Sequence, residues 1–128
     1  MEKTISQNRL EERLIEFATN ITTIKSTLKN GFESNHLYQQ IFRSATSIPL
    51  NYGESRGGFT IKDFVYKISL CLKETRETHI NLRIMKKAGL CEQEEILISL
   101  IDEANQLISI FTKTLDTTRK KYADLLRK

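Results

Sequence analysis

The stretch RSATSIPLNYGESRGG, residues 43–58, decides the fold expected for this chain. It holds the only proline, Pro49, and three of the five glycines, and it separates two helical halves of the sequence. A proline inside a helix removes one backbone hydrogen bond and crowds the carbonyl four residues back. The apolar spacing nevertheless continues past it to Tyr52. We therefore expect one kinked helix through Pro49 and a turn confined to about residues 56–59.

Apolar residues recur three and four positions apart through four segments, which is the spacing of amphipathic helices. This spacing predicts helices over about residues 9–28, 35–55, 60–88 and 92–118. Because the connections are short, consecutive helices should run antiparallel. The expected fold class is all-α, an antiparallel up-down-up-down four-helix bundle, with a single domain over residues 1–128.

Several helix ends carry recognisable signals. The pairs at residues 8–11 (Asn and Glu) and 60–63 (Thr and Asp) match the capping box, in which the first side chain caps the helix. Glycine readily adopts the left-handed conformation that ends a helix. We assign this role to Gly31 after the first helix and to Gly89 after the third.

The third helix has apolar residues on two faces. One face predicts the core contact: Ile61, Phe64, Val65, Ile68, Cys71, Leu72, Thr75, His79 and Leu82. A second apolar set lies on the far side, among charged residues: Tyr66, Leu70, Ile80 and Ile84. A helix with two apolar faces is packed on two sides. This pattern predicts a subunit interface and a homo-oligomer; the alternative is scattered apolar residues at an ordinary surface.

A polar stripe follows the second helix beside its apolar face. Its members fall three or four residues apart: Arg43, Ser47, Asn51 and Glu54. Such a stripe could form a binding or catalytic strip, or it could bond an adjacent helix. We interpret it as a structural network.

The net charge of +4 is concentrated at one end of the chain. Residues 1–111 contain 14 basic and 14 acidic residues and therefore sum to zero. Residues 112–128 contain two acidic residues and six basic ones: Lys113, Arg119, Lys120, Lys121, Arg127 and Lys128. A basic segment can bind an anionic partner such as nucleic acid. Cations near a C-terminus also favour the helix dipole, so both interpretations stay open. We expect residues 117–128 to form a frayed, basic extension.

No catalytic, metal or cofactor constellation is apparent. Cys71 and Cys91 match no metal or redox spacing, and His79 has no Glu-x-x-His partner of the kind that builds a dimetal bundle. The paired glycines follow a helix and lack the Gly-Lys-Ser/Thr ending of a phosphate-binding loop. No apolar run reaches the roughly 20 residues of a membrane span, and the polar N-terminus gives no signal peptide. We expect a cytoplasmic protein with free thiols, no cofactor and no enzymatic activity.

Two stretches resemble a known bacterial family. The run from Ile41 to Ile48 (IFRSATSI), followed by Asn51 and Glu54, is similar to the second-helix signature of four-helix bundle proteins encoded in intervening sequences of 23S rRNA genes, also called the S23 ribosomal protein family. The stretch from Lys62 to Thr78 resembles its third helix. The likeness covers most of the chain and stops before the tail that follows Thr117.

The resemblance carries its own expectations. It implies an all-helical bundle that assembles as a closed ring, typically a pentamer. It also implies a relationship to the accessory protein of diversity-generating retroelements, which binds nucleic acid and a reverse transcriptase. It brings no catalytic residue. Together with the charge, it predicts a non-enzymatic nucleic-acid-binding or ribonucleoprotein accessory protein that binds RNA or DNA, or a nucleic-acid-processing protein, through the basic residues of the tail. The alternative is a protein-interaction scaffold with no nucleic-acid role.

Overall fold

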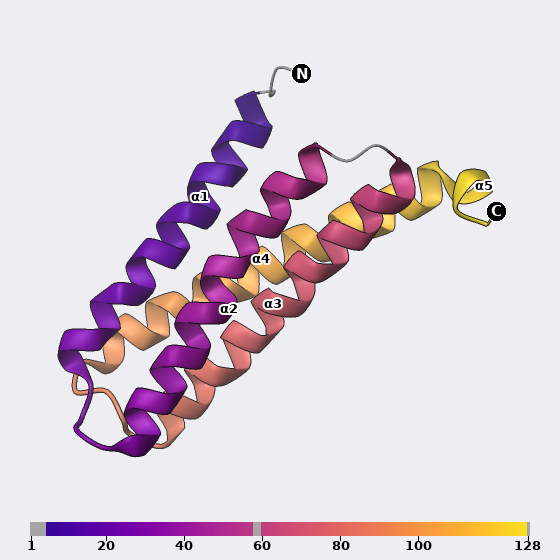
Figure 1. The fold of residues 1–128 in the computed structure, drawn as a ribbon. Coiled ribbons are helices and arrows are strands. Elements are labelled where there is room, and N and C mark those ends of the chain that lie inside the picture. The colour runs from indigo at the N-terminus through magenta and orange to yellow at the C-terminus, as the bar shows by residue number, and fades with distance from the viewer. Residues whose placement is uncertain (1–4, 58–59, 128) are drawn as a thin grey trace.

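The computed structural model describes residues 5–57 and 60–127, and nearly all of them lie in helices (Figure 1). In chain order the elements are α1 (Ile5–Ile21), the 3-10 helix η1 (Thr22–Thr27), α2 (Phe32–Arg56), α3 (Ile61–Lys87), α4 (Glu94–Lys121) and the short α5 (Ala123–Leu126). The four long helices alternate in direction and pack around one core. No strand occurs within the described ranges. The all-α bundle expected from the apolar spacing is confirmed.

The first helix departs from its predicted range of 9–28. The chain is already helical at Ile5, so Asn8 lies inside α1 and the predicted capping box is wrong. The α-helix ends at Ile21 and continues as the tighter η1. The hydroxyls of Thr22, Thr23 and Thr27 each donate to the carbonyl three residues back. Such local bonds compete with the α-helical pattern and suit a 3-10 helix.

The segment after η1 is held by the connection between α3 and α4. The Lys29 amide donates to the Leu90 carbonyl at 2.9 Å, and the Glu92 amide donates to the Thr27 carbonyl at 2.7 Å. The Thr27 Oγ1 and Cys91 Sγ atoms, both buried, lie 2.7 Å apart and form a further hydrogen bond. This antiparallel bridge takes the place of the last turn expected for the first helix.

Gly31 serves the second helix and not the first. Its φ of +146° lies in a region that only glycine adopts easily, and it occupies the N-cap position of α2. The prediction that Gly31 ends the first helix is therefore wrong, and α2 begins at Phe32, three residues before the predicted start. The helix continues without a break through Pro49 to Arg56, as predicted.

The ends of α3 match the prediction closely. The Thr60 side chain accepts a hydrogen bond from the Asp63 amide at 3.0 Å, which caps the helix. Gly89 has a φ of +66°. Its N–H donates to the carbonyl three residues back, and the N–H of Leu90 donates to the carbonyl five residues back, each at 3.1 Å. This pair of bonds is the Schellman motif that a C-terminal glycine makes possible.

The last helix is longer than predicted. α4 begins two residues after the predicted residue 92 and continues to Lys121, three residues past the predicted end. The expectation of a frayed segment is therefore wrong for residues 117–121, which are helical. Leu115 is buried there, and the half-buried Thr118 hydroxyl donates to the Thr114 carbonyl. α5 follows after Tyr122 and contacts α3.

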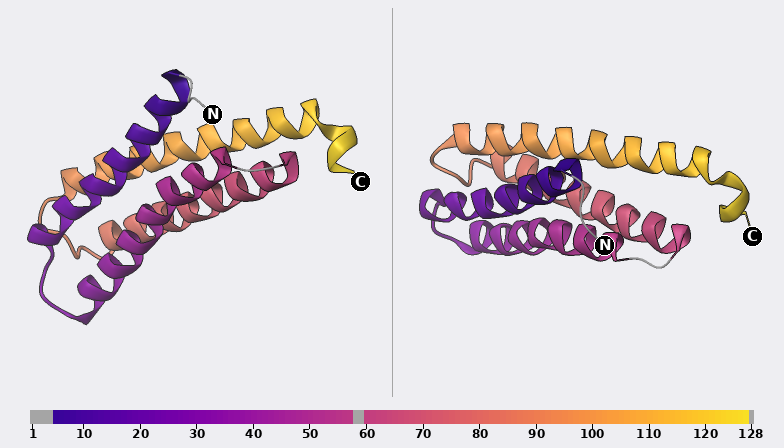
Figure 2. Two further views of the ribbon diagram at one scale, coloured as in Figure 1. Left: turned by 45° about the horizontal axis from the view of Figure 1, so that its top comes forward. Right: turned by 90° about the horizontal axis from the view of Figure 1, so that it is seen from above.

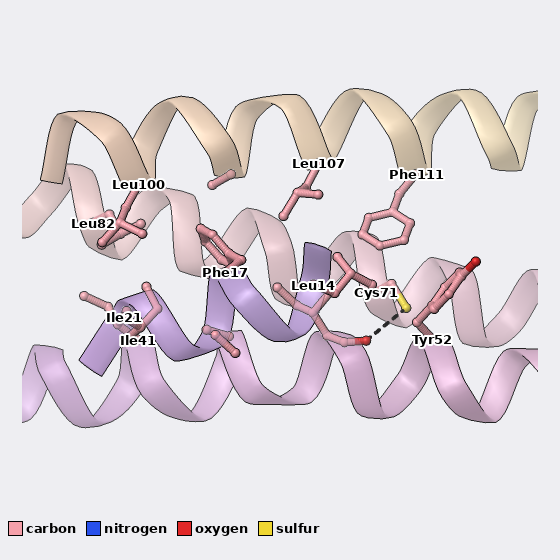
Figure 3. Close-up of a cluster of buried hydrophobic side chains, with 14 of the residues drawn as sticks. Leu14, Phe17, Ile21, Ile41, Tyr52, Cys71, Leu82, Leu100, Leu107 and Phe111 are labelled. Atoms are coloured by element: carbon pink, nitrogen blue, oxygen red, sulfur yellow. Dashed lines mark hydrogen bonds between the residues drawn. The ribbon is translucent and has the colours of Figure 1, made fainter. Parts of the chain in front are cut away.

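The core is filled by aliphatic and aromatic side chains from all four long helices (Figure 3). The largest fully buried side chains include Phe17 and Leu14 of α1 and Phe111 and Leu107 of α4. Phe111 points from α4 toward Tyr52 of α2, and the two ring centroids lie 6.5 Å apart. The predicted core face of α3 is confirmed at its centre, but Thr78 and Met85 are also buried, whereas His79 lies at the edge.

Small polar side chains fill the contact between α2 and α3, which we call the α2–α3 seam. Its members are Ser44, Cys71, Thr75 and Thr78, and each is fully buried. Ser44 Oγ and Thr78 Oγ1 share a hydrogen bond of 2.7 Å across the seam. The Cys71 thiol donates to the Ile48 carbonyl at 3.6 Å, drawn as the dashed line in Figure 3. Small residues let the two helix backbones approach closely, so α2 and α3 form the most extensive helix pair.

Candidate nucleic-acid interface and assembly faces

The predicted basic residues lie on a helix that projects from the bundle. Figure 2 shows the C-terminal end of α4, in yellow, running past the ends of α1 and α2. The side chains of Lys113, Arg119, Lys120 and Lys121 are all exposed. Lys113 and Lys120 are seven residues apart and share one face of α4, whereas Arg119 and Lys121 lie on its flanks. Arg127 follows α5, and the predicted Lys128 lies outside the described residues.

Half of these cations have partners inside the segment. Lys120 forms an ion pair with Asp116 at 3.0 Å, and Arg127 pairs with Asp124. The Lys121 Nζ atom lies 5.3 Å from the centre of the Tyr122 ring. Within the described part of the chain, Lys113 and Arg119 have no ion pair. Exposed pairs of this kind contribute at most about 1 kcal/mol, so a phosphate group can compete for these cations.

A second row of cations lies along α3 and was missed from the sequence. It alternates steps of four and three residues, contains no acidic residue, and consists of Lys62, Tyr66, Ser69, Lys73, Arg76, Ile80, Arg83 and Lys87. All five of its cations are exposed. A helix places residues with this spacing on one face. The signal was available in the sequence, because the four-and-three rule that identifies apolar faces applies equally to charges.

The second apolar face predicted for α3 lies at the surface of the bundle. Tyr66, Ile80 and Ile84 are 60%, 51% and 46% exposed, and Leu70 is half-buried. Ile80 and Ile84 form one wall of an open groove of about 580 Å³ between α3 and α4. Ile98 and Ile101 of α4 form the other wall, and the basic side chains at the rim are Arg83, Lys86 and Lys87.

A different apolar groove of about 460 Å³ lies between α1 and α2. Its exposed apolar residues are Ile15, Phe42 and Leu50, of which Leu50 is the most exposed at 67%. Pro49 also lines it, and Glu11 is its ionisable residue. The sequence analysis missed this surface, because Phe42 reads as part of the apolar face of its helix and Leu50 as an isolated residue.

The predicted polar stripe of α2 bonds the neighbouring helix only at its two ends. Arg43 Nη2 lies 2.7 Å from Glu77 and 3.4 Å from Glu74 of α3, and Glu54 pairs with Lys67 of α3 at 2.6 Å. Between them, Ser47 and Asn51 donate to backbone carbonyls of α2 itself. The stripe borders the α2–α3 seam.

The titratable groups inside the bundle are set by burial. Burial raises the pKa of the Cys71 thiol to about 12. The pKa of His79 is lowered, first by burial and then by the nearby Arg83 guanidinium. In residues 5–57 and 60–127 no three His, Cys, Asp or Glu side chains are grouped so that they could hold a metal ion. Over the same residues, no helix combines the length and apolar character needed to cross a membrane.

Comparison with known proteins places these surfaces in a family. The sequence model of the 23S rRNA-intervening sequence protein family matches residues 7–113. Among solved structures, a protein of unknown function from the S23 ribosomal protein family of Bacteroides thetaiotaomicron has a similar fold, with a TM-score of 0.75 and 24% sequence identity. That match covers 88% of this chain and 99% of the other. No protein of curated function matches this sequence. The family match ends at Lys113, so most of the basic segment lies beyond it.

Proposed function

This chain belongs to the 23S rRNA-intervening sequence protein family, and on that premise we propose that it is a non-enzymatic, self-assembling protein of the cytoplasm that binds nucleic acid. The observation that carries the proposal is the separation of charge. The bundle formed by residues 1–111 is neutral, whereas residues 112–128 carry six basic and two acidic residues, a net +4. Exposed lysine and arginine side chains on one helix suit contacts to phosphates, which are independent of base sequence.

Self-assembly strengthens the electrostatic argument. The exposed apolar residues of α3 supply a face for a second copy, and a ring of five copies would combine five segments of +4 into a charge of about +20. Binding would then be led by phosphate contacts and would weaken steeply with salt. The row of cations on α3 adds Lys73 and Arg76, which are exposed and lie away from the α3–α4 groove. Tyr66 in the same row offers a ring on which a base can stack.

The relationship to the accessory protein of diversity-generating retroelements belongs to this proposal. It adds a second class of partner, a nucleic-acid-processing protein. The closest competing proposal is a protein-interaction scaffold without a nucleic-acid role. The apolar groove between α3 and α4 favours that alternative, because isoleucine side chains are better suited to a protein partner than to phosphates.

The test is a salt titration with matched variants. Binding of labelled single-stranded RNA and duplex DNA is measured by fluorescence anisotropy for the full chain and for Lys113→Gln combined with Arg119→Gln. Each lysine or arginine that contacts a phosphate should contribute about one to the slope of log affinity against log salt, so the double variant should lose about two. Lys25→Gln combined with Lys29→Gln is the control, since both residues are exposed near the opposite end of the bundle.

The outcomes separate the candidates. Equal affinity and slope for the wild type and the Lys113/Arg119 variant would reject the C-terminal segment as the binding surface. Loss of binding in a Lys73→Gln and Arg76→Gln variant alone would move the interface to α3. No binding of either nucleic acid at low salt, with a protein co-purifying instead, would favour the scaffold.

A further inference from the structure

The two apolar grooves of the bundle lie on opposite sides and carry opposite charge. Consecutive helices are neighbours around the bundle, so the α1–α2 pair and the α3–α4 pair face away from each other. We infer that the α3–α4 groove of one copy receives the α1–α2 surface of a second copy, so that copies associate head to tail. This inference rests on the self-assembly proposed above and names the two surfaces that meet.

The α3–α4 groove needs a partner that is both apolar and acidic. Its four isoleucines provide a continuous apolar floor, and three of them are about half exposed. Three cations and no carboxylate line it. Lys86 is paired with Glu94 at 3.4 Å, whereas Arg83 and Lys87 have no ion pair within the described residues. Covering the floor removes apolar area from water, and acidic side chains opposite Arg83 and Lys87 would satisfy the rim.

The α1–α2 surface has those properties. Ile15, Phe42 and Leu50 are 43%, 39% and 67% exposed, so three large apolar side chains are available to be covered. The groove between them is lined by the carboxylate of Glu11 and by no cation. Glu12 follows on α1 with an exposed side chain. Apolar area and negative charge therefore stand together on the side opposite the basic groove.

The charges also argue against a two-fold contact of either surface with itself. In a two-fold interface the same patch is used twice, so Arg83 and Lys87 of one copy would face the same cations of the other. Like charges placed across an interface are destabilising. Contact between the two different surfaces instead pairs opposite charges. Because the surfaces lie on opposite sides of one copy, the contact repeats from copy to copy until it closes a ring or extends a filament.

The experiment breaks each surface separately in the full chain. Ile84→Arg adds a cation to the basic groove, and Leu50→Arg adds one to the α1–α2 surface; both side chains are exposed, so the fold should be retained. Asn20→Arg, on the polar groove between α1 and α4, is the matched control. The molar mass is measured by light scattering and folding by circular dichroism. The monomer mass is 14.9 kDa.

Head-to-tail association gives a specific set of results. The wild type and Asn20→Arg should be assembled, and each surface variant alone should be monomeric. An equimolar mixture of Ile84→Arg and Leu50→Arg should give a dimer of about twice the monomer mass, because each chain keeps one intact surface. If Leu50→Arg alone stays assembled, self-assembly stands but the head-to-tail contact is overturned. If the wild type is monomeric, self-assembly and this inference both fail, while nucleic-acid binding is judged separately by the salt titration.

Discussion

The α2–α3 seam and the contact between α1 and α4 solve the same packing problem with opposite materials. The seam is filled by side chains such as Ser44, Thr75 and Thr78, and the two backbones lie close along their length. α1 and α4 approach closely at few positions, and large side chains such as Phe17 and Leu107 fill the space. A core of small residues has no room for added volume, whereas a core of large residues depends on the volume it has. The two regions should therefore fail in opposite ways.

The largest expected effect comes from removing volume on the α1 side. Phe17→Ala should lower the free energy of unfolding by about 3–5 kcal/mol, because it removes a fully buried ring and leaves a cavity. Urea denaturation followed by circular dichroism measures the change. Phe32→Ala is the control, since that ring is 76% exposed and its loss should cost less than about 0.5 kcal/mol. Similar losses for the two variants would contradict the assignment of Phe17 to the core.

Adding volume to the α2–α3 seam should have the next largest effect. Thr75 is fully buried and its hydroxyl donates to the Cys71 carbonyl within α3. Thr75→Leu should destabilise the fold by about 1–3 kcal/mol, because the extra atoms force the two backbones apart. Thr75→Val keeps the shape and removes only the hydroxyl, so it should cost less, about 1 kcal/mol. Equal tolerance of leucine and valine would show that the seam is not tightly packed.

Alkaline pH should weaken the seam through Cys71. Because burial raises the pKa of this thiol to about 12, the folded state favours the neutral form. The stabilisation is complete below the unfolded-state value near 9 and is lost as the pH rises toward 12. The wild type should lose about 1.4 kcal/mol between pH 9 and pH 10 relative to Cys71→Ala. Denaturation curves of both proteins at each pH test this, and parallel pH dependences would disprove it.

The smallest effect concerns the ion pair that joins α1 to α4. Arg13 donates two hydrogen bonds of 2.7 Å to Glu103, and this bond to the carboxylate is the main cause of the raised pKa of Arg13. Since both side chains are about one-third exposed, Arg13→Met should cost only about 0.2–1 kcal/mol. The difference should shrink in high salt. A loss that is larger and independent of salt would show that Arg13 acts mainly through packing.

Local sequence patterns predicted the helices and several of their ends. Thr60 and Gly89 act where the capping rules placed them, since their roles depend on residues within five positions. Gly31 and the last turn of the first helix were assigned wrongly. At that point the chain pairs with residues 90–92, which are more than 60 positions away, and no local rule registers such a contact.

The candidate surfaces were predicted to a similar extent. The four apolar residues on the outer side of α3 could be identified from spacing, because Tyr66, Ile80 and Ile84 stand apart from its core face. The basic residues of the C-terminal segment were found by counting charge, but their helical placement was not. The α1–α2 surface could not be predicted, because Ile15 and Phe42 come from different helices and become neighbours only when those helices pack.

The amino-acid sequence by itself determined that four amphipathic helices form, that α2 continues through Pro49, and that positive charge gathers at the C-terminal end. Each of these features follows from the spacing of residues along one segment. The tertiary structure alone decided which faces meet, how closely α2 approaches α3, and that the acidic and basic grooves lie on opposite sides. The physical reason is that spacing fixes the direction of a side chain around its own helix, whereas packing between helices fixes what that side chain contacts.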